Sequence, residues 1–241
     1  TARIYPDKRD AIYDKKACSY SDLLESARKI GSYIAGMTTA GCPVCVMLDK
    51  SVDVLKTFMG TVYAGCFYTL IDPSFPDERI DKMLGVLKAE IVITDADKSD
   101  RLIGLGYTGA ILDIDKLLNI GQADDERLLA IRSEMVDTDP LYCNFTSGST
   151  GVPKGVLVCH RSVIDFIDCF TELFDITNED VIGNQAPFDF DVSVKDIYSA
   201  IKTGATIVII PKQKFMFPNA VVDMLEENNV TTLIWAVSAL C

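Results

Sequence analysis

A loop rich in glycine and hydroxyl side chains lies between two strand-like segments of the chain. Residues Thr146–Gly155 read Thr-Ser-Gly-Ser-Thr-Gly-Val-Pro-Lys-Gly. The glycines let the backbone approach a ligand closely, and the hydroxyl groups supply donors for phosphate oxygens. Lys154 adds a positive charge next to Pro153, whose ring stiffens the loop. This combination predicts a site for a polyphosphate, although the same composition is also typical of a flexible Gly/Ser hairpin loop.

The order of residues separates this loop from the two commonest nucleotide-binding loops. In the P-loop the lysine is followed by serine or threonine, whereas Lys154 is followed by Gly155. The loop also lacks the Gly-x-Gly-x-x-Gly pattern of dinucleotide sites. The residues predicted to contact phosphate are Thr146, Ser147, Gly148, Ser149, Thr150, Gly151, Lys154 and Gly155.

A second group of candidate residues surrounds Asp191, which follows an apolar segment and precedes a helical pattern. An anion there can neutralise the ammonium group of a substrate, but its spacing alone favours an ordinary surface or capping carboxylate. Ser193 and Asp196 have the Ser-x-x-Asp spacing of a capping box, which predicts a helix start. Lys195 is four residues after Asp191, so we expect an ion pair between them; the alternative is a contact with an acidic substrate side chain.

The composition excludes several classes of protein. The 241 residues carry a formal net charge of −12, so we expect neither nucleic acid nor a membrane surface as a partner. The only histidine, His160, is interpreted as a polar residue at a strand end, and no pattern of cysteine and histidine predicts a metal site. The eight cysteines lie mostly in apolar runs, and the sequence contains neither a signal peptide nor a membrane-spanning segment. A cytoplasmic location is therefore expected.

These residues must be positioned by the helices and strands around them. Short apolar runs such as Val44–Leu48 and Ile91–Thr94 alternate with helical patterns along the chain. Strands of this kind, separated by helices, predict an α/β fold with mainly parallel sheets that helices cover on both faces. The pattern weakens from about Asp95 to Asp139, and a junction between lobes is expected near residues 122–140. We therefore predict two α/β lobes, about 1–139 and about 140–241, the second carrying the loop.

The loop sequence resembles the signature of adenylate-forming enzymes, a superfamily that includes acyl-CoA synthetases, luciferases and the adenylation domains of nonribosomal peptide synthetases. The resemblance implies that the loop binds the β- and γ-phosphates of ATP. The segment Tyr63–Pro73, followed by Pro76 and Glu78-Arg79, is similar to a core segment of the amino-acid-activating branch. The resemblance extends from about Tyr13 to the end of the chain and implies the N-terminal part of that fold.

Two further segments resemble the amino-acid-activating branch. Phe190–Ser193 reads Phe-Asp-Val-Ser and is similar to a Phe-Asp-x-Ser motif whose aspartate binds the substrate α-amino group. The resemblance thus implies substrate-binding roles for Asp191, Val192 and Lys195, although Lys195 stands where that branch usually has an apolar residue. The stretch Asn184–Pro187 is similar to the D-alanine:carrier-protein ligase branch.

The activity implied by the resemblance is formation of an aminoacyl-adenylate from an amino acid, ATP and Mg²⁺. Transfer to the phosphopantetheine thiol of a carrier protein would follow. The superfamily's adenine, ribose and catalytic-lysine segments have no match in this sequence, so we expect the chain to be the N-terminal part of a longer enzyme and to be inactive alone. The alternatives are an acyl- or aryl-CoA ligase and a non-catalytic nucleotide-binding module.

Overall fold

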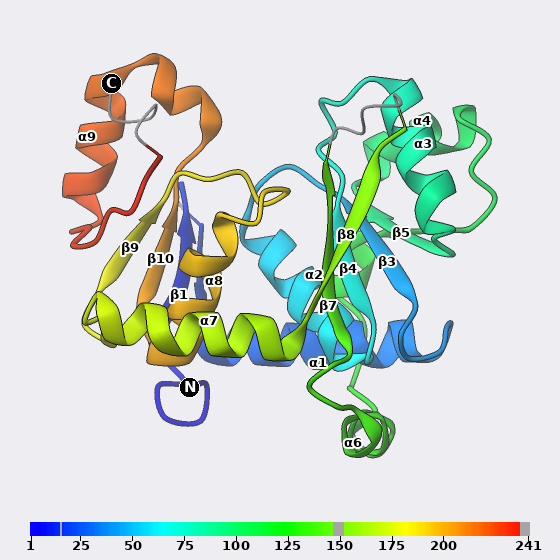
Figure 1. Ribbon diagram of the computed structural model, residues 1–241, viewed down its shortest axis with the longest axis horizontal. Coiled ribbons are helices and arrows are strands. Elements are labelled where there is room, and N and C mark those ends of the chain that lie inside the picture. Colours follow the sequence, from blue (N-terminus) through cyan, green and yellow to red (C-terminus); the bar gives the residue numbers. More distant parts are fainter. Residues whose placement is uncertain (15, 147–151, 237–241) are drawn as a thin grey trace. The chain divides into compact units, whose positions relative to one another are not determined.

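Two mainly parallel β-sheets organise the fold, which the computed structural model describes over residues 1–14, 16–146 and 152–236 (Figure 1). The chain divides into two units, each with its own sheet. Unit 1 comprises Thr1–Leu23, Lys50–Val52 and the chain from Ser162 onward. Unit 2 comprises Leu24–Asp49 and Asp53–Arg161. The predicted α/β class with mainly parallel sheets is confirmed.

The division falls at other positions than the sequence predicted. The segment 140–159, expected in the second lobe, belongs to unit 2 because its first strand pairs with a strand at residues 67–70. The first residues of the chain belong to unit 1, since Ala11–Tyr13 pair with Ile207–Ile209. Both pairings join residues far apart in the sequence, so a weakened local pattern near 122–140 gave no sign of them.

The sheet of unit 2 has six strands in the order β6-β5-β3-β4-β7-β8. All neighbours are parallel except β7 and β8, which form an antiparallel hairpin. The strands are β3 (Pro43–Met47), β4 (Phe67–Leu70), β5 (Ile91–Thr94), β6 (Ala110–Asp113), β7 (Pro140–Thr146) and β8 (Lys154–Cys159). Every residue of β4 and β5 is buried, as expected for parallel strands with both faces covered.

Five helices of unit 2 follow or connect these strands: α2 (Val52–Tyr63), α3 (Asp77–Leu87), α4 (Ala96–Gly104), α5 (Ile114–Leu118) and α6 (Asp125–Glu134). Helix α3 illustrates why the sequence folds in this way. Pro76 precedes its first turn with a φ of −57°, which suits a helix start, and Ile80, Met83 and Leu84 recur on one buried face. They pack with Met47 and Val92 in the core of this sheet.

The sheet of unit 1 has four strands in the order β2-β1-β10-β9. They are β1 (Arg9–Tyr13), β2 (Lys16–Ser19), β9 (Val181–Asn184) and β10 (Thr206–Ile209). Strand β10 is parallel to both β1 and β9, whereas β2 is antiparallel to β1. The helices are the start of α1 (Tyr20–Ala35), α7 (His160–Leu173), α8 (Ser193–Thr203), the 3-10 helix η1 (Lys212–Met216) and α9 (Pro218–Glu227). Across the described residues, no helix combines the length and apolar character needed to cross a membrane.

Asp10, in strand β1, is a buried carboxyl group with only 2% of its surface exposed. Its Oδ2 atom has no hydrogen-bond partner among the described residues. The hydroxyl of Tyr20 donates its single proton to the carbonyl oxygen of Ala200 or Ala205, both 2.6 Å away. It therefore does little to stabilise the charged form of the Asp10 carboxyl group. Burial raises the pKa of the Asp10 carboxyl to about 7. The folded chain therefore favours the neutral acid.

The buried Asp10 predicts a pH-dependent loss of stability. Between about pH 4 and pH 7 the unfolded chain ionises this group whereas the folded chain does not, so the free energy of unfolding falls as pH rises. Above pH 7 the loss is complete, at about 4 kcal/mol. Asp10→Asn, which stays neutral, should thus be more stable than the wild type at pH 8 but not at pH 4, as measured by urea unfolding. The exposed Asp7→Asn is the control, and an equal effect of both substitutions would contradict the prediction.

Candidate functional site

The β7–β8 hairpin holds both ends of the predicted phosphate loop. Thr146 ends β7 and pairs with Lys154, the first residue of β8, and the Thr146 hydroxyl donates to the Lys154 carbonyl at 3.4 Å. Ser147–Gly151, the middle of the predicted site, lie outside the described residues. The register of the two strands thus fixes where the loop starts and where it ends.

Lys154 and Gly155 lie at the exposed start of the hairpin's second strand. Gly155 has a packing role that the sequence did not reveal, because a Cβ atom at this position would lie 2.8 Å from Cys143 Sγ. The glycine thus lets β8 pass closely over the buried thiol of β7. The ammonium group of Lys154, on an exposed residue, has no ion-pair partner among the described residues and is available to an anion.

Asp191 and Val192 form the turn before helix α8, and both are exposed. The backbone of this turn is ordered by its own hydrogen bonds: Val194 N donates to Asp191 O at 3.0 Å, and Ser193 N donates to Phe190 O at 3.0 Å. The predicted capping box is wrong. The Ser193 hydroxyl donates back to Phe190 O at 2.7 Å, so it does not cap the helix, and Val192 occupies the cap position without a side-chain bond.

Lys195 does not form the predicted ion pair with Asp191. Its ammonium group lies 2.6 Å from Oδ1 of Asp196, and both residues are buried. The Asp196 carboxylate accepts a second bond from the side-chain amide of Asn184 at 2.8 Å. Burial raises the pKa of the Asp196 carboxyl, while the charge of Lys195 acts in the opposite direction. Asp191, for its part, is paired with no cation in the described part of the chain.

Lys50 joins the polar cluster of Lys195, Asp196 and Asn184 through a bond to Asn184. Its role was not predicted from the sequence. Its ammonium group donates to the carbonyl oxygens of Asn184, Gln185 and Ile210 at 3.1, 3.3 and 3.4 Å. Burial lowers the pKa of Lys50 to about 7, and the charge of Asp196 partly offsets this effect. The only available signal was a lysine three residues after the buried strand β3, where connections usually carry exposed residues.

His160 begins helix α7, and its backbone N–H donates to Asp139 O at 3.1 Å. Its Nε2 atom is buried without a hydrogen-bond partner among the described residues. Burial lowers the pKa of the imidazole, so the neutral ring is favoured. The position of His160, directly after strand β8 and at the start of α7, fits its interpretation as a polar residue at a strand end.

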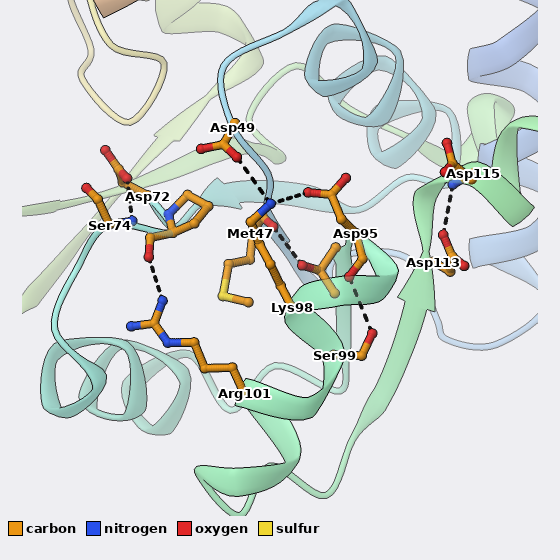
Figure 2. A network of polar contacts seen from close by, with 12 residues as sticks. Met47, Asp49, Asp72, Ser74, Asp95, Lys98, Ser99, Arg101, Asp113 and Asp115 are labelled. Atoms are coloured by element: carbon orange, nitrogen blue, oxygen red, sulfur yellow. Dashed lines mark hydrogen bonds and ion pairs between the residues drawn. The ribbon is translucent and has the colours of Figure 1, made fainter. Parts of the chain in front are cut away.

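The carboxyl edge of the six-stranded sheet is a second place where α/β proteins commonly bind ligands. Figure 2 shows Asp49, Asp72 and Asp95, which follow strands β3, β4 and β5, each bonded to a neighbouring group. Lys98 pairs with Asp49 and Asp95, and Asp72 accepts the backbone N–H of Ser74 at 2.7 Å. Arg101 donates to the carbonyl oxygens of Pro73 and Phe75. Asp49, Asp72 and Asp95 at this edge are thus engaged with neighbouring groups of the chain.

The described residues contain no preformed cluster of side chains typical of a metal site. Within 1–14, 16–146 and 152–236, no group of three or more His, Cys, Asp or Glu side chains is placed to hold a metal ion. The carboxylates at the carboxyl edge of the six-stranded sheet are engaged with lysine, arginine and backbone N–H groups. No step of the chemistry is therefore assigned to a metal held by these residues.

Comparison with known proteins adds the family context. The family described as AMP-binding enzyme matches residues 1–240. The chain is 29% identical to tyrocidine synthase 1 of Brevibacillus parabrevis over 234 residues, which cover 96% of this chain and 21% of that protein. It is 28% identical to an L-proline–[L-prolyl-carrier protein] ligase of Pseudomonas fluorescens over 236 residues, which cover 96% of this chain and 47% of the ligase. The chain thus spans less than half of either relative.

A solved structure gives the same picture of the fold. The nonribosomal peptide synthetase FmoA3 in its AMPPNP-bound form is 25% identical and matches with a TM-score of 0.82, covering 95% of this chain and 24% of that one. The chain therefore shares the fold of a structure that binds an ATP analogue.

The ion pair of Lys195 with Asp196 predicts that Lys195→Met destabilises the protein. The substitution leaves a buried carboxylate without its closest cation, which should lower the free energy of unfolding by about 3 kcal/mol in urea titrations. The double variant Lys195→Met, Asp196→Asn removes both charges and should recover most of that loss.

The control for this prediction is Lys202→Met on the same helix. Lys202 pairs with Asp168 at 2.6 Å, but both side chains are well exposed, so its loss should cost less than about 1 kcal/mol. A Lys195→Met variant as stable as Lys202→Met, or a double variant no better than the single one, would contradict the ion-pair interpretation.

Proposed function

Because the chain belongs to the AMP-binding enzyme family, whose members are ATP-dependent, AMP-forming ligases, we propose that it serves to activate an amino acid as an aminoacyl-adenylate. In this reaction a carboxylate oxygen of the amino acid attacks the α-phosphorus of ATP, and pyrophosphate leaves. The protein aligns the two reactants and stabilises the charge that develops on the phosphate oxygens. We further propose that the aminoacyl group then passes to the phosphopantetheine thiol of a carrier protein.

The phosphate-binding part of the proposal rests on the β7–β8 hairpin. Its two strands hold the ends of the Thr146–Gly155 loop together, and Lys154 extends an ammonium group that is not neutralised within the described residues. Backbone N–H groups of the glycine-rich loop and this charge suit the β- and γ-phosphates of ATP. The roles of Thr146, Lys154 and Gly155 in binding ATP, and those of Ser147–Gly151, remain part of the proposal.

The choice of an amino acid rests on one observation: Asp191 is exposed before α8, and the lysine predicted to neutralise it is engaged elsewhere. Lys195 is bonded to Asp196, so the Asp191 carboxylate is left to meet the ammonium group of a substrate. A fatty or aromatic acid carries no such charge. The named activity of the carrier-protein ligase relative supports the same class of substrate and the thiol acceptor.

The function is tested by amino-acid-dependent exchange of labelled pyrophosphate into ATP, using the protein at its natural length. Each amino acid is compared with the carboxylic acid that lacks its amino group. Exchange that requires the amino group supports the proposal. Equal exchange with the des-amino acids indicates an acyl- or aryl-CoA ligase, and ATP binding without any exchange indicates a non-catalytic module; either result overturns it.

Asp191→Ala should weaken amino-acid use in the same assay. Loss of the carboxylate leaves the substrate ammonium without its counter-ion, so kcat/KM for the amino acid should fall about thirtyfold or more, or about 2 kcal/mol. The KM for ATP should change less than about twofold, since the phosphate site involves other residues.

Asp165→Ala, an exposed aspartate on α7, serves as the charge-matched control and should behave like the wild type. On a des-amino substrate the wild type and Asp191→Ala should be equally poor. If Asp191→Ala loses as much with the des-amino acid as with the amino acid, Asp191 does not bind the ammonium group.

A further inference from the structure

Lys50 donates hydrogen bonds to three backbone carbonyl groups at the carboxyl edge of the unit 1 sheet. It lies between β3 and α2 in the sequence but belongs to unit 1, where β9 and β10 are paired in parallel (Figure 1). Asn184 is the last residue of β9, Gln185 follows it, and Ile210 follows β10. An ammonium group has three protons, and all three have a carbonyl acceptor here.

The residues that Lys50 contacts lead directly to the turn that carries Asp191. Asn184 bonds Lys50 through its backbone carbonyl and Asp196 of helix α8 through its side chain. The Lys50 ammonium also lies 5.2 Å from the centre of the Phe188 ring, a cation–π distance, and Phe188 is only 3% exposed. Lys50 therefore contacts this segment both where it leaves β9 and three residues before Asp191.

We propose that Lys50 is a positioning residue for the amino-acid site, which fixes the segment Asn184–Phe188 and thereby the turn from which Asp191 extends. This inference rests on the proposed function. Lys50 acts through the backbone and through Phe188, without contact to the substrate itself. A neutral side chain of similar length would keep the packing on Phe188 but would leave Gln185 O and Ile210 O without their donor.

The loss of Lys50 should disturb this segment locally, with the sheet preserved. The carbonyl oxygen of Asn184 keeps its bond from the backbone N–H of Ile210 at 3.1 Å, so the pairing of β9 and β10 does not depend on Lys50. The carbonyl of Gln185, which lies beyond the strand, has no such second donor among the bonds of the described backbone. Without Lys50, the backbone of Asn184–Phe188 should therefore become most mobile from Gln185 onward, on the side that leads to Asp191.

Lys8 offers a matched control within the same unit. Its ammonium group donates to the carbonyl oxygens of Asn178 and Gly204, the latter at 2.5 Å. These residues precede β9 and β10, so Lys8 joins the amino ends of the same two strands whose carboxyl ends Lys50 joins. Both lysines are half-buried, and burial lowers the pKa of both. The two lysines differ in the end of β9 and β10 to which they bind: Lys8 binds at the amino ends and Lys50 at the carboxyl ends.

The test compares Lys50→Met, Lys50→Arg and Lys8→Met in the natural-length protein by amino-acid-dependent pyrophosphate exchange and thermal unfolding. Lys50→Met should raise the KM for the amino acid about tenfold, the effect of losing hydrogen bonds from a charged donor, and change the KM for ATP less than about twofold. Lys50→Arg keeps the charge and should raise the amino-acid KM only about threefold. Lys8→Met should lower the melting temperature by a similar amount to Lys50→Met without changing either KM.

The outcomes separate this inference from the function on which it depends. An inactive wild type refutes the proposed function. An active wild type with an unchanged amino-acid KM in Lys50→Met refutes the positioning role alone, as does a Lys8→Met variant with the same rise in KM. If Lys50→Met does not fold, the inference is tested with Lys50→Arg. An amino-acid KM of Lys50→Arg equal to that of the wild type overturns the inference.

Discussion

Parallel strands end with backbone carbonyl groups at one edge of the sheet, and each of these groups needs a hydrogen-bond donor. Near this edge of both sheets, long basic side chains from elsewhere in the sequence donate to backbone carbonyls. In unit 2, Arg101 donates to the carbonyls of Pro73 and Phe75, in the loop that follows β4. In unit 1, Lys50 reaches those of Asn184 and Ile210. Two of the 23 lysine and arginine residues of the chain are thereby bound to the backbone near a sheet edge.

Features set by nearby residues were predictable from the sequence. The apolar period of α3, its proline start and the mainly apolar strands β4 and β5 specify a βαβ arrangement without knowledge of distant partners. The loop Thr146–Gly155 was placed between two strands for the same reason, and the structure pairs those strands as a hairpin. Local composition was sufficient because each of these features is completed within a few residues.

Features that depend on distant residues were not predictable in this way. Spacing on a helix suggested Asp191 as the partner of Lys195, but it could not show that Asn184 orients Asp196 towards the same ammonium group. The contacts of Lys50 span more than a hundred residues of sequence. The limits of unit 1 were missed for the same reason, since its sheet joins the start of the chain to the strand at Thr206–Ile209.

The pairing of Lys195 also bears on how a substrate side chain is selected. An acidic substrate side chain would have to compete with Asp196, whose carboxylate already lies 2.6 Å from the ammonium group and is held there by Asn184. Exchanging one carboxylate for another gains little electrostatic energy and leaves Asp196 buried without its cation, a change that usually costs several kcal/mol. The buried pair thus disfavours an acidic side chain beside Lys195, since this lysine already has its carboxylate partner in Asp196.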